Sequence, residues 1–235
     1  MRPVGKHSLP APIDSIAAKG RVEYDPPAMS HTFSFVRHGS TEFNERRIFI
    51  GSLDVPLSAR GARQALASGD SIDRDAFDVV YTSPLARAFQ TAAIVTGLAR
   101  PIFQPDGSWM LQYITAPDLS PGLPLIADPR LAERSFGELQ GVSHLQVEDR
   151  FPHYRGRSVT QSFSDRPTGG ESFADLEHRV TAFLRELSKR HRDTRFLVFS
   201  HNGPIRIAAK YFLGLSEQET LERDNPHCEL LTFTQ

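Results

Sequence analysis

The chain has 235 residues, of which 39% are hydrophobic and 23% are charged, proportions typical of folded globular proteins and unlike those of disordered or membrane chains. Its 27 Lys and Arg residues nearly balance its 28 Asp and Glu residues, so no overall field attracts nucleic acid or an anionic membrane surface. Cys228 is the single cysteine, which excludes an internal disulfide and suits a cytoplasmic location, and no run of about 18 apolar residues indicates a membrane span.

Residues 1–30 differ in composition from the rest of the chain. They have scattered charge, no hydrophobic periodicity and five prolines, namely Pro3, Pro10, Pro12, Pro26 and Pro27. This composition predicts an extended N-terminal arm. We assign residues 31–235 to one domain, because a chain of this length buries one sizeable core.

The first regular pattern covers residues 32–36. These residues are β-prone and alternating, and Arg-His-Gly follows at 37–39, so the segment predicts a strand that leads into a functional loop. Ser58 is placed to cap a helix, and residues 77–81 predict a second strand. The inner face of that helix is expected to carry Ala62, Ala65, Leu66, Gly69 and Ile72.

A second helix and a long connection come next. Ser83 and Pro84 form a helix start, with serine at the N-cap and proline at the first helical position, and Gly97 ends the helix. Residues 98–130 are rich in Pro, Gly and Asp, which predicts a long excursion with one short strand near Leu125.

The last part of the chain again alternates between helix and strand patterns. A long amphipathic helix is predicted over residues 172–190, and a strand over 196–199. A helix from Pro204 to Gly214 and a final strand over 230–233 complete the series.

This alternation predicts an α/β fold in three layers, with a mostly parallel central sheet covered by helices on both faces. Ligands in such folds bind beyond the carboxyl ends of the strands. His38, Ser83 and His201 each follow a predicted strand, so we expect them at one edge of the sheet.

The tripeptide Arg37-His38-Gly39 is weak evidence by itself, because a histidine at a strand end often has only a structural role. Further segments change that interpretation. Together with the tripeptide they resemble the histidine phosphatase superfamily, in its phosphoglycerate-mutase-like branch. The resemblance runs from about residue 33 to 233. The segments are Thr41-Glu42-Phe43-Asn44, Leu57-Ser58-x-x-Gly61, Ser83-Pro84-Leu85-x-Arg87-Ala88-x-Gln90-Thr91-Ala92, Glu133-Arg134-x-Phe136-Gly137-x-x-x-Gly141 and Ser200-His201-Asn202-Gly203.

The resemblance implies that His38 attacks phosphorus in line and forms a phosphohistidine, which water then hydrolyses. It also implies chemistry without a metal or cofactor, and the other histidines show no metal-binding spacing. A phosphoryl group in transfer spreads negative charge over its oxygens, so fixed cationic and hydrogen-bonding groups stabilise it. Arg37, Arg87 and His201 are predicted to supply these groups.

Three further residues are predicted to contact the substrate: Gly39, Asn44 and Asn202. Gly39 would let a bound group approach the backbone closely. The Asn44 amide would hold phosphoryl oxygens or orient the nucleophile, and the alternative is an asparagine that only forms a turn. Asn202 belongs to the same segment as His201.

Glu133 is predicted to protonate the leaving group, a step that needs a carboxyl group protonated often enough at working pH. The alternative is that Glu133 only forms an ion pair with the neighbouring Arg134.

Phosphoglycerate mutases resemble this chain but usually carry tyrosine where Phe136 stands and lysine where His144 stands. Their paired-arginine segment has no clear counterpart between residues 150 and 166. We therefore favour a phosphatase acting on a small phosphorylated metabolite. A cofactor-dependent phosphoglycerate mutase stays open, as does a low-activity regulatory or interaction protein on the same fold, and a homodimer is compatible with the sequence.

Overall fold

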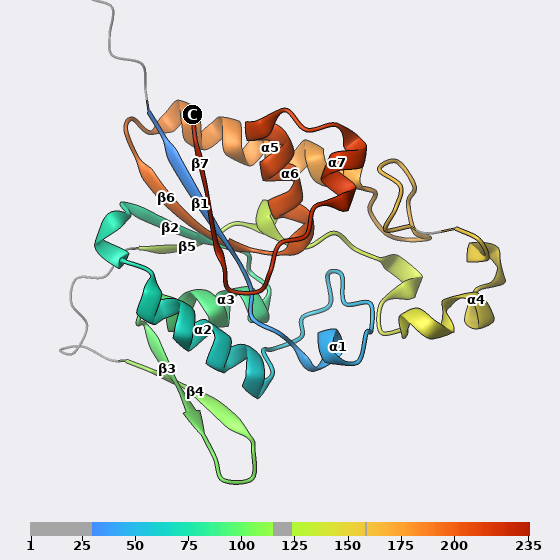
Figure 1. Ribbon diagram of the computed structural model, residues 1–235, viewed down its shortest axis with the longest axis horizontal. Coiled ribbons are helices and arrows are strands. Elements are labelled where there is room, and N and C mark those ends of the chain that lie inside the picture. Colours follow the sequence, from blue (N-terminus) through green and yellow to red (C-terminus); the bar gives the residue numbers. More distant parts are fainter. Residues whose placement is uncertain (1–29, 115–123, 158) are drawn as a thin grey trace, which may run out of the picture.

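The computed structural model describes residues 30–114, 124–157 and 159–235, so the predicted arm lies outside the described residues except for Ser30. A five-stranded sheet in the order β5-β2-β6-β1-β7 forms its centre (Figure 1). The strands are β1 (Thr32–Arg37), β2 (Val79–Thr82), β5 (Leu125–Ala127), β6 (Arg195–Ser200) and β7 (Leu230–Thr234). Strands β5, β2, β6 and β1 are parallel, and β7 pairs antiparallel with β1 at the edge. The predicted mostly parallel sheet is confirmed.

Helices cover both faces of the sheet, as the three-layer prediction requires (Figure 1). The helices α5 (Phe173–Arg190) and α6 (Asn202–Leu213) pack on one face, and α2 (Ala59–Ser71) and α3 (Ala86–Val95) on the other. Because side chains alternate along a strand, Phe196 and Val198 face α5 and α6 while Leu197 and Phe199 face α3. All four of these side chains are fully buried.

The prediction of only one strand within residues 98–130 was wrong. Strands β3 (Ala99–Phe103) and β4 (Trp109–Tyr113) form a separate antiparallel hairpin. Its inner face places Phe103, Trp109 and Leu111 against a cluster on α2 and α3. The short strand expected near Leu125 is present as β5.

The start of α3 also differs from the prediction. The helix begins at Ala86 rather than at Pro84, and its N-cap residue Leu85 makes no side-chain cap. The carboxylate of Asp54 accepts a hydrogen bond from the Ala86 N–H at 2.6 Å instead, so a distant loop caps the helix. The serine that was expected to cap, Ser83, is used elsewhere.

Two smaller expectations about helices also need correction. Leu66 of α2 was predicted to face inward, but 43% of it is exposed. Helix α6 begins at Asn202, two residues before the predicted Pro204, and it ends at Gly214 in the left-handed conformation as expected.

Several short helical segments were not predicted. The helices α1 (Glu42–Glu45) and α7 (Glu217–Glu222) both begin with a capping box. Between β5 and α5 lie α4 (Val147–Arg150) and the 3-10 turns Pro129–Leu131, Gly137–Leu139, His144–Gln146 and Pro152–Tyr154; another 3-10 turn, Arg74–Ala76, precedes β2. The segment from residue 136 to 163, which we call the lobe, projects to one side of the sheet around α4 (Figure 1).

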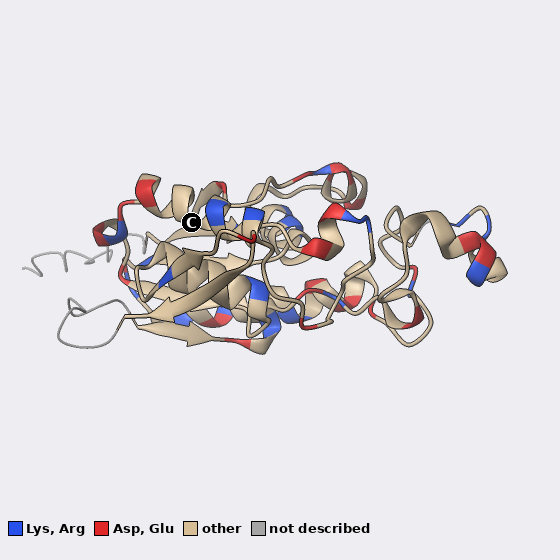
Figure 2. Ribbon diagram, turned by 90° about the horizontal axis from the view of Figure 1, so that it is seen from below, with Lys and Arg blue, Asp and Glu red and all other residues tan. Residues whose placement is uncertain are grey.

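Lys and Arg residues are interspersed with Asp and Glu residues along the ribbon (Figure 2), in keeping with the near balance of charge in the sequence. Within the described ranges, no helix has the length and apolar character that crossing a membrane requires.

Candidate active site

The three residues expected at one edge of the sheet do lie together there. His38 follows β1, Ser83 follows β2 and His201 follows β6, and these strands are adjacent and parallel. The ring centroids of His38 and His201 are 5.0 Å apart. Ser83 and His201 have no exposed surface, and 4% of His38 is exposed.

Hydrogen bonds fix the loop that carries His38. The His38 N–H donates to the carbonyl of Ser200, and the Gly39 N–H donates to the hydroxyl of Thr91. The Ser40 N–H donates to the side-chain oxygen of Gln64 at 2.8 Å. The loop backbone is therefore held before any ligand binds.

Glycine is required at position 39 for a reason other than the predicted one. A Cβ atom there would lie 2.4 Å from the carbonyl oxygen of Gly61 in α2. Close approach between two segments of the protein therefore already excludes a side chain here, and close approach of a bound group stays a prediction.

The imidazole of His38 is oriented by its own loop. Its Nδ1 lies 2.7 Å from the carbonyl of Gly39. A carbonyl only accepts hydrogen bonds, so Nδ1 carries the proton and Nε2 keeps its lone pair. Burial lowers the pKa of His38 well below its usual value, and the nearby Arg87 lowers it further. His38 therefore presents a neutral, nucleophilic Nε2 at neutral pH.

Arg87 lies against that nitrogen, with its Nε 3.3 Å from His38 Nε2. Its two terminal nitrogens donate to the carbonyls of Leu53 and Gly51, each at 2.7 Å. The side chain is almost fully buried, and burial lowers its pKa to about 10, so it is still a cation at neutral pH. Three hydrogen bonds thus fix a positive charge beside the nucleophile.

The second imidazole, His201, is oriented by Ser83. Its Nε2 lies 2.8 Å from the Ser83 hydroxyl, which itself accepts a hydrogen bond from the Leu85 N–H. The Ser83 hydroxyl can then donate its proton to His201 Nε2, and on this arrangement we assign the proton of the neutral ring to Nδ1. Burial lowers the pKa of His201 well below its usual value, so the ring is neutral.

Two buried nitrogens at this edge of the sheet have no hydrogen-bond partner among the residues that the structure describes: Arg37 Nε and His201 Nδ1. Leaving such donors unpaired costs free energy, and they are suited to an oxyanion. The charge of Arg37 is close enough to contribute to the lowered pKa of both His38 and His201. The other end of Arg37 donates to the carbonyl of Asn225 and lies 3.7 Å from the Asp224 carboxylate.

Glu133 contacts the first turn of α6. Its carboxylate accepts hydrogen bonds from the backbone N–H groups of Gly203 and Arg134. The guanidinium of Arg134 donates to the carbonyls of Glu171 and Val159 rather than to Glu133, so the alternative of a side-chain ion pair is not what the structure shows. Burial lowers the pKa of Arg37 and of Arg87, and the nearby negative charge of Glu133 offsets part of that lowering in both.

Asn44 and Asn202 take part in local hydrogen bonds. The Asn44 side-chain oxygen accepts from the backbone and hydroxyl of Thr41 in the capping box of α1, which is the structural role left open for it. Its amide nitrogen is not part of that box, so a contact with substrate stays a prediction. The Asn202 oxygen accepts from the side chain of the buried Asn225 at 2.8 Å.

Sequence reasoning missed two residues of this site, Asn225 and His227. His227 lies with its ring centroid 5.3 Å from that of His38, and Asn225 contacts both Arg37 and Asn202. The signal available was their place just before the final strand, which pairs with the strand that ends at His38. Among the described residues, no cluster of three or more His, Cys, Asp or Glu side chains is arranged to hold a metal ion.

Comparisons with known proteins agree with this geometry. Residues 33–106 and 113–235 match the model of the histidine phosphatase superfamily (branch 1). A phosphoserine phosphatase 1 of Hydrogenobacter thermophilus is 31% identical over 180 residues, which cover 77% of this chain and 75% of that protein. A 2,3-bisphosphoglycerate-dependent phosphoglycerate mutase of Chlamydia pneumoniae is 28% identical over 200 residues, covering 81% and 88%.

Solved structures show the same fold. A mycobacterial glucosyl-3-phosphoglycerate phosphatase superimposes with a TM-score of 0.69 at 23% identity, over 86% of this chain and 91% of that one. The α-ribazole phosphatase of Shigella flexneri gives a TM-score of 0.69 at 24% identity, over 86% and 89%. At these identities the likeness shows the fold alone.

The fold and the strand-end histidines thus agree with one class of enzyme, the histidine phosphatases. The chain belongs to the histidine phosphatase superfamily, branch 1, as the resemblance predicted. Its relatives carry the names of both phosphatases and mutases, in line with the predicted activity and its first alternative.

The buried histidines make acid stability a first test. A histidine whose folded pKa is depressed binds fewer protons folded than unfolded, so the free energy of unfolding falls as pH falls below about 6.5. For His227, whose pKa burial lowers to about 4, the loss at pH 5 is on the order of 2 kcal/mol. Urea unfolding of wild type and His227→Phe at pH 7 and pH 5 measures this. We expect the variant to lose less stability on acidification, and equal losses would contradict the assignment.

The role of Ser83 gives a second test. Ser83→Ala removes the donor that keeps the proton of His201 on Nδ1, so we expect turnover of a phosphomonoester to fall by about tenfold or more. Ser83→Thr keeps the hydroxyl and should retain more activity. NMR of ¹⁵N-labelled imidazoles reports the tautomer directly, and an unchanged Nδ1–H tautomer of His201 in Ser83→Ala would argue against this role.

Proposed function

We propose that this protein hydrolyses small phosphomonoesters and that the phosphoryl group passes through Nε2 of His38. The observation that carries the proposal is the fixed, neutral His38 ring, whose Nδ1–H is bound to the Gly39 carbonyl while Nε2 lies beside Arg87. A nucleophile for in-line displacement needs a nitrogen that carries no proton, as Nε2 of His38 does, together with a nearby cation.

The reaction has two steps. In the first, Nε2 of His38 forms a bond to phosphorus as the bond from phosphorus to the leaving oxygen breaks, and the Glu133 carboxyl gives its proton to that oxygen. In the second, water attacks the phosphohistidine, the nitrogen–phosphorus bond breaks and Glu133 takes a proton from the water. Inorganic phosphate and the free alcohol are the products.

The charge of the transferring group has suitable partners. We assign Arg37, Arg87 and the Nδ1–H of His201 to the phosphoryl oxygens. The unpaired buried nitrogens of Arg37 and His201 support this assignment, because a bound oxyanion would satisfy both. Asn44 and Asn202 border the same region and are proposed substrate contacts.

The lobe supports hydrolysis over mutase activity. At the positions where mutases usually carry tyrosine and lysine, the rings of Phe136 and His144 pack on Phe49, at centroid distances of 5.1 and 3.9 Å. Neither side chain offers the phenol or ammonium group of a mutase. Two arginines between residues 150 and 166, Arg157 and Arg166, form ion pairs with aspartates of the chain.

The substrate class proposed here is a small phosphorylated metabolite. We also infer a cytoplasmic location, from the lone cysteine and the composition, and leave a homodimer as compatible. A regulatory protein with low activity is the competing proposal, and a binding partner that requires residues 1–30 would favour it.

The first test compares wild type and His38→Ala on a panel of phosphomonoesters with chelator present and with or without 2,3-bisphosphoglycerate. We expect wild type to release phosphate without the bisphosphate, and His38→Ala to lose at least about 10³-fold in rate, because the covalent route is closed. Acid-labile ³²P on wild type only would identify the phosphohistidine. Strong mutase turnover with negligible hydrolysis would overturn the proposal.

The second test concerns Glu133. A poor leaving group, such as the alkoxide of a sugar, needs the proton, whereas p-nitrophenolate leaves without it. We therefore expect Glu133→Gln to slow an alkyl phosphate by about 10²–10⁴-fold and p-nitrophenyl phosphate far less. Glu217→Gln is a suitable control, because Glu217 is exposed on α7, outside both the site and the lobe. Equal losses on both substrates would remove Glu133 as the acid.

A further inference from the structure

The segment from Asp224 to Cys228 joins α7 to β7, and it carries no motif of the superfamily that the sequence analysis used. It lies directly against Arg37, at the end of β1, and His38, in the loop that follows. Four hydrogen bonds link this segment, which we call the clamp, to the loop and its neighbour Asn202.

Arg37 is held by the clamp at both its side chain and its backbone. Its guanidinium donates to the Asn225 carbonyl at 2.7 Å, and its own carbonyl accepts from the Cys228 N–H at 2.9 Å. Asn225 is fully buried and donates its side-chain amide to Asn202 at 2.8 Å. The clamp therefore links the end of β1 to the residue Asn202, which follows β6.

His38 is held through its carbonyl oxygen. Nδ1 of His227 bonds that carbonyl, and since a carbonyl only accepts, this nitrogen of His227 carries the proton. The two rings lie with centroids 5.3 Å apart. His227 therefore holds the carbonyl end of the peptide between His38 and Gly39, and Thr91 holds its N–H end. The carbonyl of the next peptide, that of Gly39, orients the nucleophile.

The backbone of the clamp is strained at its last residue. Cys228 has φ of 62°, in the left-handed region that is unfavourable for a residue other than glycine. The Ser68 hydroxyl donates to the Cys228 carbonyl at 2.8 Å and the Cys228 N–H bonds Arg37, so contacts on both sides hold this conformation. Strain of this kind persists only where surrounding contacts determine it, and it is concentrated at functional sites.

Part of the clamp borders open space. A pocket of about 460 Å³ separates it from part of α2, lined by Gln64, Ser68, Ser71, His227, Cys228 and Leu230 among others. Removing a hydrogen bond from the clamp therefore leaves it space to move, rather than leaving the same geometry in place.

We infer that His227 is a positioning residue for the nucleophile: it holds the His38 carbonyl so that Nε2 of His38 stays in line for attack on phosphorus. This inference rests on the proposed function of His38. His227 does not take part in bond making, so its loss should slow the phosphorylation of His38 more than it weakens substrate binding.

The experiment measures single-turnover phosphorylation of His38 from p-nitrophenyl phosphate, together with kcat and KM, in the full chain. His227→Phe keeps a ring but has no donor, and we expect it to slow phosphorylation by about 10–100-fold, as small misplacements of reacting atoms do. KM should change by less than about threefold, since Arg87 and His201 remain in place. His227→Asn places an amide donor near the former Nδ1 and should restore most of the rate.

His178→Phe is the matched control, because His178 is exposed on α5 and should give wild-type values. If His227→Phe does not fold, as judged by circular dichroism, His227→Ala takes its place. Wild-type phosphorylation in the donor-free variant, or no recovery with His227→Asn, would overturn the inference while leaving the proposed function standing. A wild-type protein that never becomes phosphorylated would refute the proposed function first, and the inference with it.

Discussion

The hydrogen bond between Nδ1 of His38 and the carbonyl of Gly39 is the interaction on which the chemistry of this site depends. It places the proton on one nitrogen and leaves the other as a nucleophile. The bond joins two adjacent residues, so it keeps its geometry only if contacts from other parts of the chain hold the loop backbone. Contacts from Thr91, Gln64, Ser200 and His227 provide this, and they come from α3, α2, β6 and the approach to β7. The reactive geometry is thus a property of the whole sheet and its helices.

Burial explains how the site combines neutral rings with fixed cations. Removing water disfavours the charged form of each imidazole, so His38 and His201 stay neutral beside two arginines. An arginine has a much higher intrinsic pKa and stays charged even when burial lowers that pKa to about 10, as for Arg87. The same burial therefore leaves the imidazoles neutral and the arginines positively charged. It also favours binding of an anion, because few waters compete for the unpaired donors.

The sequence predicted the central sheet and most of the site because these follow local patterns. Strand periodicity and the capping signals at Ser58 and Ser172 act over a few residues, and both helices begin where expected. The β3–β4 hairpin was missed although Asp106-Gly107 lies between alternating apolar residues, a typical hairpin signal that the nearby prolines obscured. The start of α3 was not predictable, because Asp54 supplies its cap from 32 residues away and Ser83 is bound to His201 instead.

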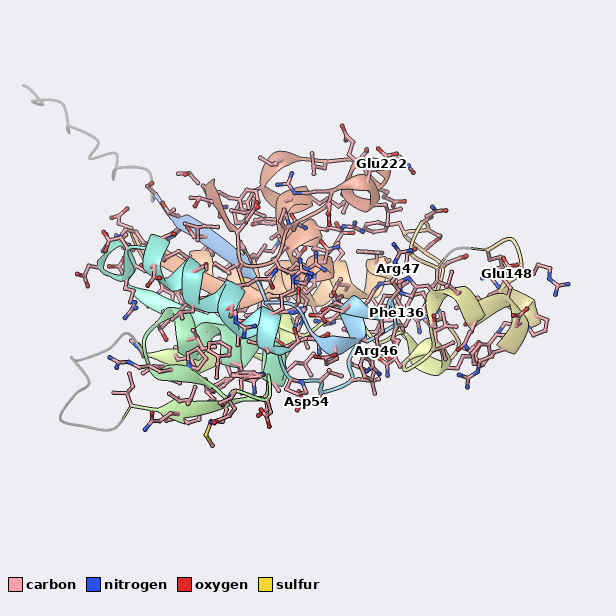
Figure 3. All side chains as sticks on the ribbon, turned by 60° about the horizontal axis from the view of Figure 1, so that its bottom comes forward. Arg46, Arg47, Asp54, Phe136, Glu148 and Glu222 are labelled. Atoms are coloured by element: carbon pink, nitrogen blue, oxygen red, sulfur yellow. The ribbon has the colours of Figure 1, made fainter. Side chains whose placement is uncertain are left out.

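The lobe is a part of the chain that can vary in sequence without disturbing the strand ends. Arg46, Arg47 and Phe136 lie where the lobe meets the body, and Glu148 lies on its outer part (Figure 3). The lobe has its own small core of Leu139, Tyr154 and Val159, distinct from the clusters on the sheet, and a pocket of about 220 Å³ adjoins that core. Substitutions there leave the strand ends and their hydrogen bonds in place. We therefore expect the lobe to decide which phosphomonoester is accepted, while the sheet edge decides that phosphorus is the atom attacked.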